Sequence, residues 1–213
     1  MSDQQKLTLS VLMAAFLWLI MFSPWTGGRL NFWLEMTFAA VVLSGLTLAF
    51  TPDRKTLFQV EKPLQQLAVG IVIAIALWGV FWVGDKLSSL LFNFARPEVD
   101  AVYAMKTGLP PYAIALLLIL VIGPAEELFW RGYVQRTLVR ILPGKRSANL
   151  AFVLTTLIYA LVHIWSFNFM LIMAALVAGA VWGFIYRLNP KLLPALVLSH
   201  ALWDALVFVI FPI

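Results

Sequence analysis

Seven long runs of apolar residues follow one another along the chain, separated by short polar segments. Roughly 17–25 consecutive apolar residues suffice for a helix to cross a membrane, so this pattern predicts seven transmembrane helices. The predicted spans are Leu7–Phe22, Phe32–Phe50, Leu64–Val83, Tyr112–Leu138, Leu150–His163, Phe169–Tyr186 and Leu192–Phe211. The fold class we expect is therefore all-α, a polytopic transmembrane helix bundle without internal repeats.

The composition of the 213 residues agrees with a membrane protein. Apolar residues make up 62% of the chain and charged residues 12%, and the mean hydropathy is +0.93, whereas soluble domains are roughly half apolar and a quarter charged. The absence of cysteine excludes disulfides, thiolate catalysis and Cys-ligated metals. The first apolar run lacks a small-residue cleavage site, so we expect a retained span and no secretory signal.

Lysine and arginine are distributed unevenly between the loops on the two sides of the predicted bundle. Cytoplasmic loops carry the excess of these residues, which predicts that the N-terminus is cytoplasmic and the C-terminus outside. We attribute the net charge of +5 to this bias and not to nucleic-acid binding. The inside residues are Lys6, Arg54, Lys55, Lys62, Arg136, Arg140, Lys145, Arg146, Arg187 and Lys191, and the outside residues are Arg29, Lys86, Arg96 and Lys106.

Aromatic residues and one long polar segment complete this topology. Tryptophans are enriched at membrane interfaces, so several of them near span ends are predicted to be anchors; the candidates are Trp18, Trp25, Trp33, Trp82, Trp130, Trp165 and Trp203. In the segment Asp85–Gly108, Leu87–Phe94 is expected to continue the third helix. For the charged remainder we favour an external loop or interfacial helix over a substrate-gating element.

Five ionisable side chains lie inside the predicted spans, at Glu126, Glu127, His163, His200 and Asp204. Such groups are costly in a bilayer unless they are paired or line a watery cavity, and they are functional candidates by default. Residues four apart share one helix face, and this spacing relates Glu127 to Arg131, Tyr159 to His163, and His200 to Asp204. The three polar faces can meet only inside the bundle, so one buried polar site is predicted.

The two adjacent glutamates are expected to have different roles. Neighbouring side chains diverge by about 100° around a helix, so Glu127 faces Arg131 as an ion pair while Glu126 is left for the cavity as candidate general base. The helix rise of about 1.5 Å per residue sets the ionisable groups roughly 14–21 Å from their cytoplasmic helix ends. Gly123-Pro124 is expected to interrupt the helix locally. Taken singly, the Glu127–Arg131 pair and Tyr159 are structural residues.

Three motifs in this order resemble the CPBP family of intramembrane proteases, also called the CAAX-protease and bacteriocin-processing or Abi family. They are Glu126-Glu127-Leu128-Phe129-Trp130-Arg131, Tyr159-Ala160-Leu161-Val162-His163 and His200-Ala201-Leu202-Trp203-Asp204. The resemblance covers about Pro110–Val209. It divides one integrated membrane domain into N-terminal helices and an external loop, residues 1–109, and a catalytic helical core, residues 110–213.

The resemblance implies hydrolysis of a peptide bond within the membrane. It implies that Glu126 and His163 activate water, that His200 and the residue at position 204 stabilise the oxyanion, and that Glu127 and Arg131 support the site. Asparagine is common at the last position, whereas this chain has Asp204. An ionised aspartate donates no hydrogen bond, so Asp204 either orients His200 or is kept protonated by burial.

The nucleophile and the metal content are separate questions. The chain has no cysteine and no Gly-x-Ser-x-Gly elbow, which favours water as the nucleophile. Glu126, His163 and His200 have the donor types of a His₂Glu zinc site. The same residues also suffice for glutamate-based catalysis without a cofactor. We favour catalysis without metal and keep zinc as the alternative.

The expected activity is that of an intramembrane endopeptidase in a bacterial cytoplasmic membrane, acting on a membrane-anchored protein or hydrophobic peptide. A proton-coupled transporter is the first alternative, because buried Glu and His also form proton relays, although no inverted repeat is present. A non-catalytic scaffold or immunity protein is the second. The expected partners are the substrate and the lipid bilayer, without nucleic acid.

Overall fold

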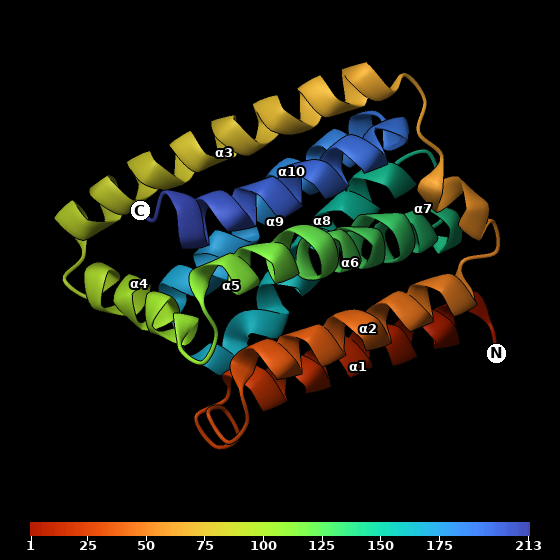
Figure 1. Cartoon of the computed structure of the whole chain (residues 1–213). Helices are drawn as coiled ribbons and strands as arrows, with labels where there is room; N and C mark the ends of the chain where they lie inside the picture. The colour runs from red at the N-terminus through yellow and green to blue at the C-terminus, as the bar shows by residue number, and fades with distance from the viewer.

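The computed structural model describes residues 1–213 and is entirely helical, with seven helices long and apolar enough to cross a membrane. This confirms the predicted fold class and number of spans. The spans lie side by side, and the two chain ends lie at opposite ends of the bundle (Figure 1). The seven spans are Asp3–Phe22, Phe32–Phe50, Pro63–Leu91, Pro111–Ile141, Ser147–Ser166, Phe169–Leu188 and Pro190–Ile210.

Four spans are single α-helices, and the other three combine several helical types. The single helices α1, α2 and α3 are Asp3–Phe22, Phe32–Phe50 and Pro63–Leu91, and α9 is Phe169–Leu188. The fourth span comprises α5 (Pro111–Leu117), α6 (Gly123–Glu127) and α7 (Arg136–Ile141), joined by π-helices Leu118–Ile122 and Leu128–Gln135. The fifth span is α8 (Ser147–Leu161) followed by the 3₁₀ helix Val162–Ser166. The seventh span begins with the 3₁₀ helix Pro190–Leu192, continues as α10 (Leu193–Ala205) and ends with the π-helix Leu206–Ile210. The connecting helices are α4 (Ala95–Tyr103) and the 3₁₀ helices Arg54–Phe58 and Ala104–Lys106.

Polar caps define where several spans begin. The side chain of Asn31 accepts hydrogen bonds from the backbone N–H groups of Trp33 and Leu34, and Asn168 accepts one from Leu171. Such caps satisfy donors that have no partner in the first turn of a helix. They place short connections before α2 and α9.

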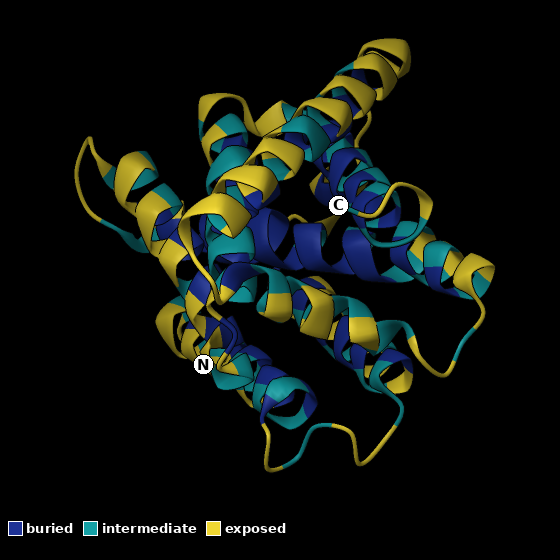
Figure 2. Ribbon diagram, turned by 90° about the vertical axis from the view of Figure 1, so that its left-hand side faces the viewer, coloured by how far each residue is buried: buried dark blue, intermediate teal, exposed yellow.

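The fourth span forms the centre of the bundle. Figure 2 shows a continuous buried stretch through the middle of the molecule, and the residues from Phe129 to Gln135 are all buried. In contrast, α3 lies on the outside, packs mainly against α10 and exposes many apolar side chains, among them Leu64 and Leu90. An apolar exterior around a polar centre is the arrangement that a bilayer requires.

The local departure expected at Gly123-Pro124 is present in the helical hydrogen bonding, but the fourth span is not broken there. It changes its winding instead, with one π-helix before Gly123–Glu127 and one after it. A Cβ atom added to Gly123 would lie 2.7 Å from the Cα of Ala201. Glycine at this position therefore lets the backbones of α6 and α10 touch, which brings the seventh span, with the third motif, against the fourth.

The segment Asp85–Gly108 folds as the end of α3 followed by α4. Three connections tie α4 to other elements. Oε2 of Glu98 accepts a hydrogen bond of 2.8 Å from the N–H of Met170, and the Tyr103 hydroxyl donates one of 2.8 Å to the carbonyl of Val207. Arg96 forms an ion pair of 3.1 Å with Asp85. This helix is therefore held to α3, α9 and the end of the seventh span.

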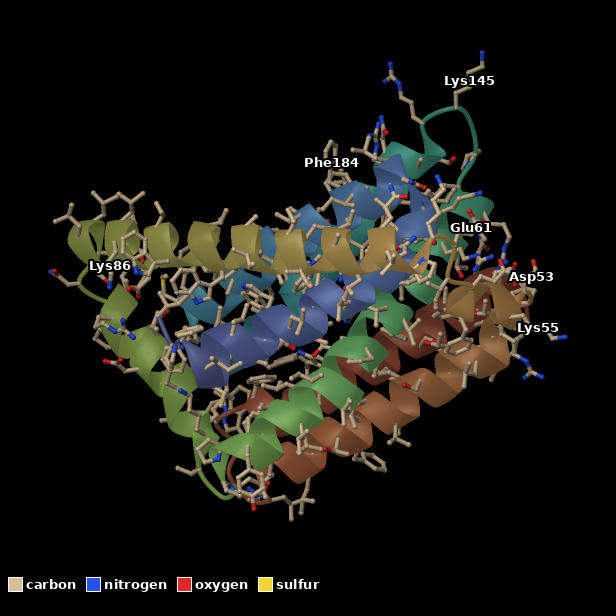
Figure 3. The ribbon with its side chains drawn as sticks, turned by 45° about the horizontal axis from the view of Figure 1, so that its top comes forward. Asp53, Lys55, Glu61, Lys86, Lys145 and Phe184 are labelled. Carbon is tan, nitrogen blue, oxygen red and sulfur yellow. The ribbon has the colours of Figure 1, made fainter.

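The charged ends of the bundle agree in part with the expected topology. Lys55 and Lys145 lie at one end, with Asp53 and Glu61, and Lys86 lies at the opposite end (Figure 3). Lys55 and Lys145, predicted for one side, are thus separated from Lys86, predicted for the other. Which end is cytoplasmic stays a prediction.

Candidate active site

Five of the seven candidate residues line one cavity of about 500 Å³ inside the bundle. Glu126 comes from α6, Tyr159 and His163 from the fifth span, and His200 and Asp204 from α10. Most of the other lining side chains are hydrophobic and come from α2, α3, α4 and α9. Glu127 and Arg131 do not line the cavity and lie behind its wall.

Glu126 presents its carboxylate to this cavity. Its Oε2 accepts a hydrogen bond of 3.2 Å from the hydroxyl of Tyr159, which is the one hydrogen bond of this carboxylate to the protein. The Tyr159 ring lies edge-on to Trp130, and a Cβ atom added to Gly179 would lie 2.8 Å from its Cδ1. Tyr159 is thus held on both sides and fixes one oxygen of Glu126, leaving the other free for a ligand or water.

Glu127 and Arg131 form a fully buried ion pair that extends to His200. Nη1 of Arg131 lies 3.1 Å from Oε2 of Glu127, and Nη2 donates a hydrogen bond of 3.0 Å to the carbonyl of Gly179. The same Oε2 lies 3.1 Å from Nδ1 of His200. The sequence placed Glu127 opposite Arg131 alone, so the contact with His200 is an addition from the structure.

The His200 ring contacts the carboxylate of Glu127 and the aromatic face of Trp182. Its ring stacks on Trp182 with centroids 3.9 Å apart and planes inclined by 18°. Its Nε2 lies 3.6 Å from Oδ2 of Asp204, which is longer than a hydrogen bond. The Asp204 side chain is 16% exposed and the His200 side chain 2%. Asp204 therefore lies beside His200 at the cavity wall without a hydrogen bond to it.

His163 has both ring nitrogens engaged. Nδ1 lies 2.8 Å from the carbonyl oxygen of Tyr159, and Nε2 accepts a hydrogen bond of 3.0 Å from Nε1 of Trp18. Because a carbonyl only accepts, the proton of the neutral ring is on Nδ1. Sequence analysis missed this partner: Trp18 was predicted to be an interfacial anchor, but it is 1% exposed and lies in the core.

Other tryptophans lie either on the exposed surface of the bundle or in its core. Trp25 and Trp82 are exposed, as membrane anchors are, whereas Trp33 and Trp130 are buried. Of the seven tryptophans considered as anchors, Trp18, Trp33 and Trp130 are therefore core residues. A feature that marks Trp18 in the sequence is its spacing from Ser10 and Ala14, since small residues four apart are typical of a packed face of a membrane helix.

The residues as arranged do not fit the zinc site that we kept as an alternative. No three His, Asp or Glu side chains come close enough together to hold a metal ion. Nε2 of His163, which a zinc ion would need, already accepts the N–H of Trp18. No step of the reaction is therefore derived through a metal.

A comparison with known proteins identifies the part of the chain that carries the three motifs. Residues 107–206 match the family model described as Type II CAAX prenyl endopeptidase Rce1-like. The match confirms the predicted resemblance and covers almost the same segment as the motifs. No curated protein and no solved structure matches the chain.

Proposed function

Because residues 107–206 match the family model of type II CAAX prenyl endopeptidases, we propose that this protein hydrolyses a peptide bond within the membrane, with water activated by Glu126. The observation that carries the proposal is the carboxylate of Glu126, which lines an apolar cavity and has Oε2 held by Tyr159, with no protein hydrogen bond to Oε1. A free carboxylate oxygen in a cavity is what a general base requires.

In the proposed reaction, Oε1 of Glu126 takes a proton from a water molecule as the water oxygen attacks the carbonyl carbon of the substrate. The resulting tetrahedral intermediate carries the negative charge on the former carbonyl oxygen. Glu126 then returns the proton to the amide nitrogen as the carbon–nitrogen bond breaks, which regenerates the carboxylate. Tyr159 keeps the carboxylate in place through its hydrogen bond of 3.2 Å to Oε2.

His200 is the proposed donor to the oxyanion. Its Nδ1 faces Glu127 and its Nε2 faces the cavity near Asp204. With a proton on each nitrogen, the ring donates one N–H to Glu127 and offers the other to the oxyanion. Donors that are fixed before the reaction contribute strongly in a site from which water is excluded. Asp204 supports this state by its charge, 3.6 Å from Nε2.

The proposed substrate is a membrane-anchored protein or a hydrophobic peptide. The wall of the cavity is mostly hydrophobic and includes Phe81 of α3, Val102 of α4 and Met173 of α9. Such a wall suits an apolar segment or lipid tail on either side of the scissile bond. Prenylated proteins, peptide precursors and C-terminal sorting tails all have this character, and we place the reaction in a bacterial cytoplasmic membrane.

We propose that the reaction needs no metal. A membrane-permeant chelator is expected to leave the activity of the purified protein unchanged, because His163 is held by Trp18 and Tyr159. Loss of activity on chelation and recovery with added zinc would contradict this part of the proposal.

The substitution Glu126→Gln tests the function. It removes the base and keeps the side-chain volume, so peptide hydrolysis should fall to background while the protein remains folded. Glu35→Gln is the matched control, because Glu35 is a partly buried acid of α2 outside the cavity. Both variants are compared with wild type by a peptidase assay and by melting temperature in detergent.

Substantial hydrolysis by Glu126→Gln would assign the base to another residue. If the wild-type protein cleaves no membrane-anchored substrate, a proton-flux measurement in liposomes decides between the two alternatives. Flux would favour the transporter, and its absence would favour the scaffold.

A further inference from the structure

Trp18 of α1 contacts the candidate active site although it lies about a hundred residues before the first motif. We propose that Trp18 is a positioning residue, which holds His163 by donating its indole N–H to Nε2 and thereby fixes Glu126 through His163 and Tyr159. The inference rests on the proposed function for its effect on hydrolysis, but the hydrogen bond itself does not. It makes the N-terminal helix a part of the catalytic machinery.

Three hydrogen bonds connect Trp18 to the candidate base in an unbroken series. Nε1 of Trp18 donates to Nε2 of His163 over 3.0 Å, and Nδ1 of His163 donates to the carbonyl of Tyr159 over 2.8 Å. The hydroxyl of Tyr159 then donates to Oε2 of Glu126 over 3.2 Å. All four side chains are buried. A displacement of His163 is therefore passed to the residue that holds the carboxylate.

The direction of each hydrogen bond determines the tautomer and the ring orientation of His163. The carbonyl of Tyr159 only accepts and the indole of Trp18 only donates, so neutral His163 is protonated on Nδ1 and has its lone pair on Nε2. Reversal of the ring would break both bonds. Trp18 thus selects one orientation and one tautomer of His163.

The packing around His163 reinforces this position. Its ring lies edge-on to Trp18 with centroids 5.8 Å apart, and edge-on to Tyr159 with centroids 5.3 Å apart. The ring of Phe22, one helix turn after Trp18, lies 5.8 Å away. At this point α8 becomes a 3₁₀ helix, in which backbone bonds run to the third preceding residue. Here the carbonyl oxygen of Tyr159 accepts a hydrogen bond from the imidazole of His163, four residues later in the chain.

The series of hydrogen bonds also separates the roles of His163 and Glu126. Nε2 of His163 already accepts the N–H of Trp18, so it is not free to accept a proton from water. The Glu126 carboxylate, in contrast, makes its one protein hydrogen bond through Oε2, which leaves Oε1 for water. In our proposal Glu126 alone takes the proton, and His163 acts by holding Tyr159 and the cavity wall in place.

The hydrogen bond is tested by nitrogen NMR of protein labelled with ¹⁵N-histidine. The chain has two histidines, so four ring-nitrogen signals are expected, and the spectrum of His200→Gln assigns the two that belong to His163. Wild type should show one protonated nitrogen and one that is not protonated for His163. Trp18→Phe keeps an aromatic ring but removes the donor, so the Nε2 signal of His163 should move. Unchanged signals would overturn the proposal.

Trp33→Phe is the matched control, because Trp33 is a buried tryptophan of α2 whose Nε1 has no hydrogen-bond partner. It removes a similar volume without removing a hydrogen bond, and the His163 signals should stay in place. Any loss of activity in this variant measures the cost of exchanging a buried tryptophan beside the cavity.

The kinetic measurement decides whether the hydrogen bond matters for the reaction. Misplacement of a reacting group by about 1 Å can cost on the order of 10²-fold, so Trp18→Phe should lower kcat by about 10–10²-fold with KM almost unchanged. A loss no greater than that of Trp33→Phe, with shifted nitrogen signals, would overturn the positioning role. If wild type does not hydrolyse peptides, the proposed function fails, whereas the nitrogen signals still decide the hydrogen bond.

Discussion

Nδ1 of His200 lies 3.1 Å from Oε2 of Glu127, and both side chains are shielded from solvent by the surrounding protein. This oxygen is also the one that Nη1 of Arg131 contacts. The first and third motifs, separated by some seventy residues of sequence, therefore share one carboxylate. The ion pair that looks like a local helix contact also orients the imidazole in the cavity.

We predict that Glu127→Gln and Arg131→Ala destabilise the protein, because each leaves the other charge buried without a partner. Removing one partner of a buried pair typically costs about 3–5 kcal/mol. Melting temperature and yield in detergent should both fall. Glu61→Gln, which breaks the exposed ion pair of 3.0 Å with Lys191, is the control and should melt close to wild type. Wild-type melting of both buried variants would show that the pair is not structural.

Asp204→Asn should retain appreciable activity, because asparagine keeps the size of the side chain and can donate directly to the oxyanion. Asp204→Ala should lose on the order of 10²–10³ in rate, the effect of removing one transition-state contact. The distance of 3.6 Å to His200 means that no hydrogen bond is lost in the Asn variant. The measurement is kcat for both variants. Equal inactivity of the two would instead assign a necessary negative charge to Asp204.

Tyr103 should make the protein less stable at high pH. Burial raises the pKa of its hydroxyl above the ordinary value of 10.0. The protonated form is thus favoured by folding, and its contribution is complete below pH 10 and is lost as the pH rises through the higher folded-state pKa. The ionised form cannot donate to the carbonyl of Val207.

The check is the melting temperature of wild type and Tyr103→Phe across this pH range. Lys106, whose ammonium lies 4.4 Å from the Tyr103 ring, is present in both proteins, and so are Arg96 and Asp85. The difference between the two curves therefore isolates the hydroxyl. The advantage of wild type should shrink above pH 10, and parallel curves would contradict the prediction.

The orientation of the bundle can be measured directly, because the chain has no cysteine of its own. A single cysteine at Ser147 should react with an impermeant maleimide only after cells are opened. Cysteines at Ser89 or Thr107 should react in intact cells. The reverse result would place the N-terminus outside.

Hydropathy predicted the seven spans well, because length and apolar character alone decide whether a helix can cross a bilayer. The continuation of the third helix into Leu87–Phe94, which the sequence led us to expect, is confirmed as far as Leu91. Asp85 and Lys86 interrupt the apolar run, but α3 continues to Leu91. Asp85 forms ion pairs with Lys86 of the same helix and with Arg96 of α4, and the periodicity of α3 cannot indicate the contact with α4.

Within the candidate site, the spacing of four residues correctly grouped side chains that share a helix face. It could not indicate which groups meet across helices, so the contacts of Glu127 with His200 and of Trp18 with His163 were missed. Both depend on how close the spans approach. That approach is set by small residues such as Gly123, whose role is visible only once its neighbour Ala201 is known.

The two π-helices around Gly123–Glu127 have a consequence for insertions and deletions in this span. A π turn closes its hydrogen bond one residue later than an α turn, so removing one residue would allow the segment to wind as an ordinary α-helix. Each residue of an α-helix turns the chain by about 100°. Deletion of the exposed Leu120 would thus preserve the hydrophobic character of the span. It would nevertheless rotate the part before Gly123 relative to the part that carries Glu126, so the number of residues in this helix matters as much as their identity.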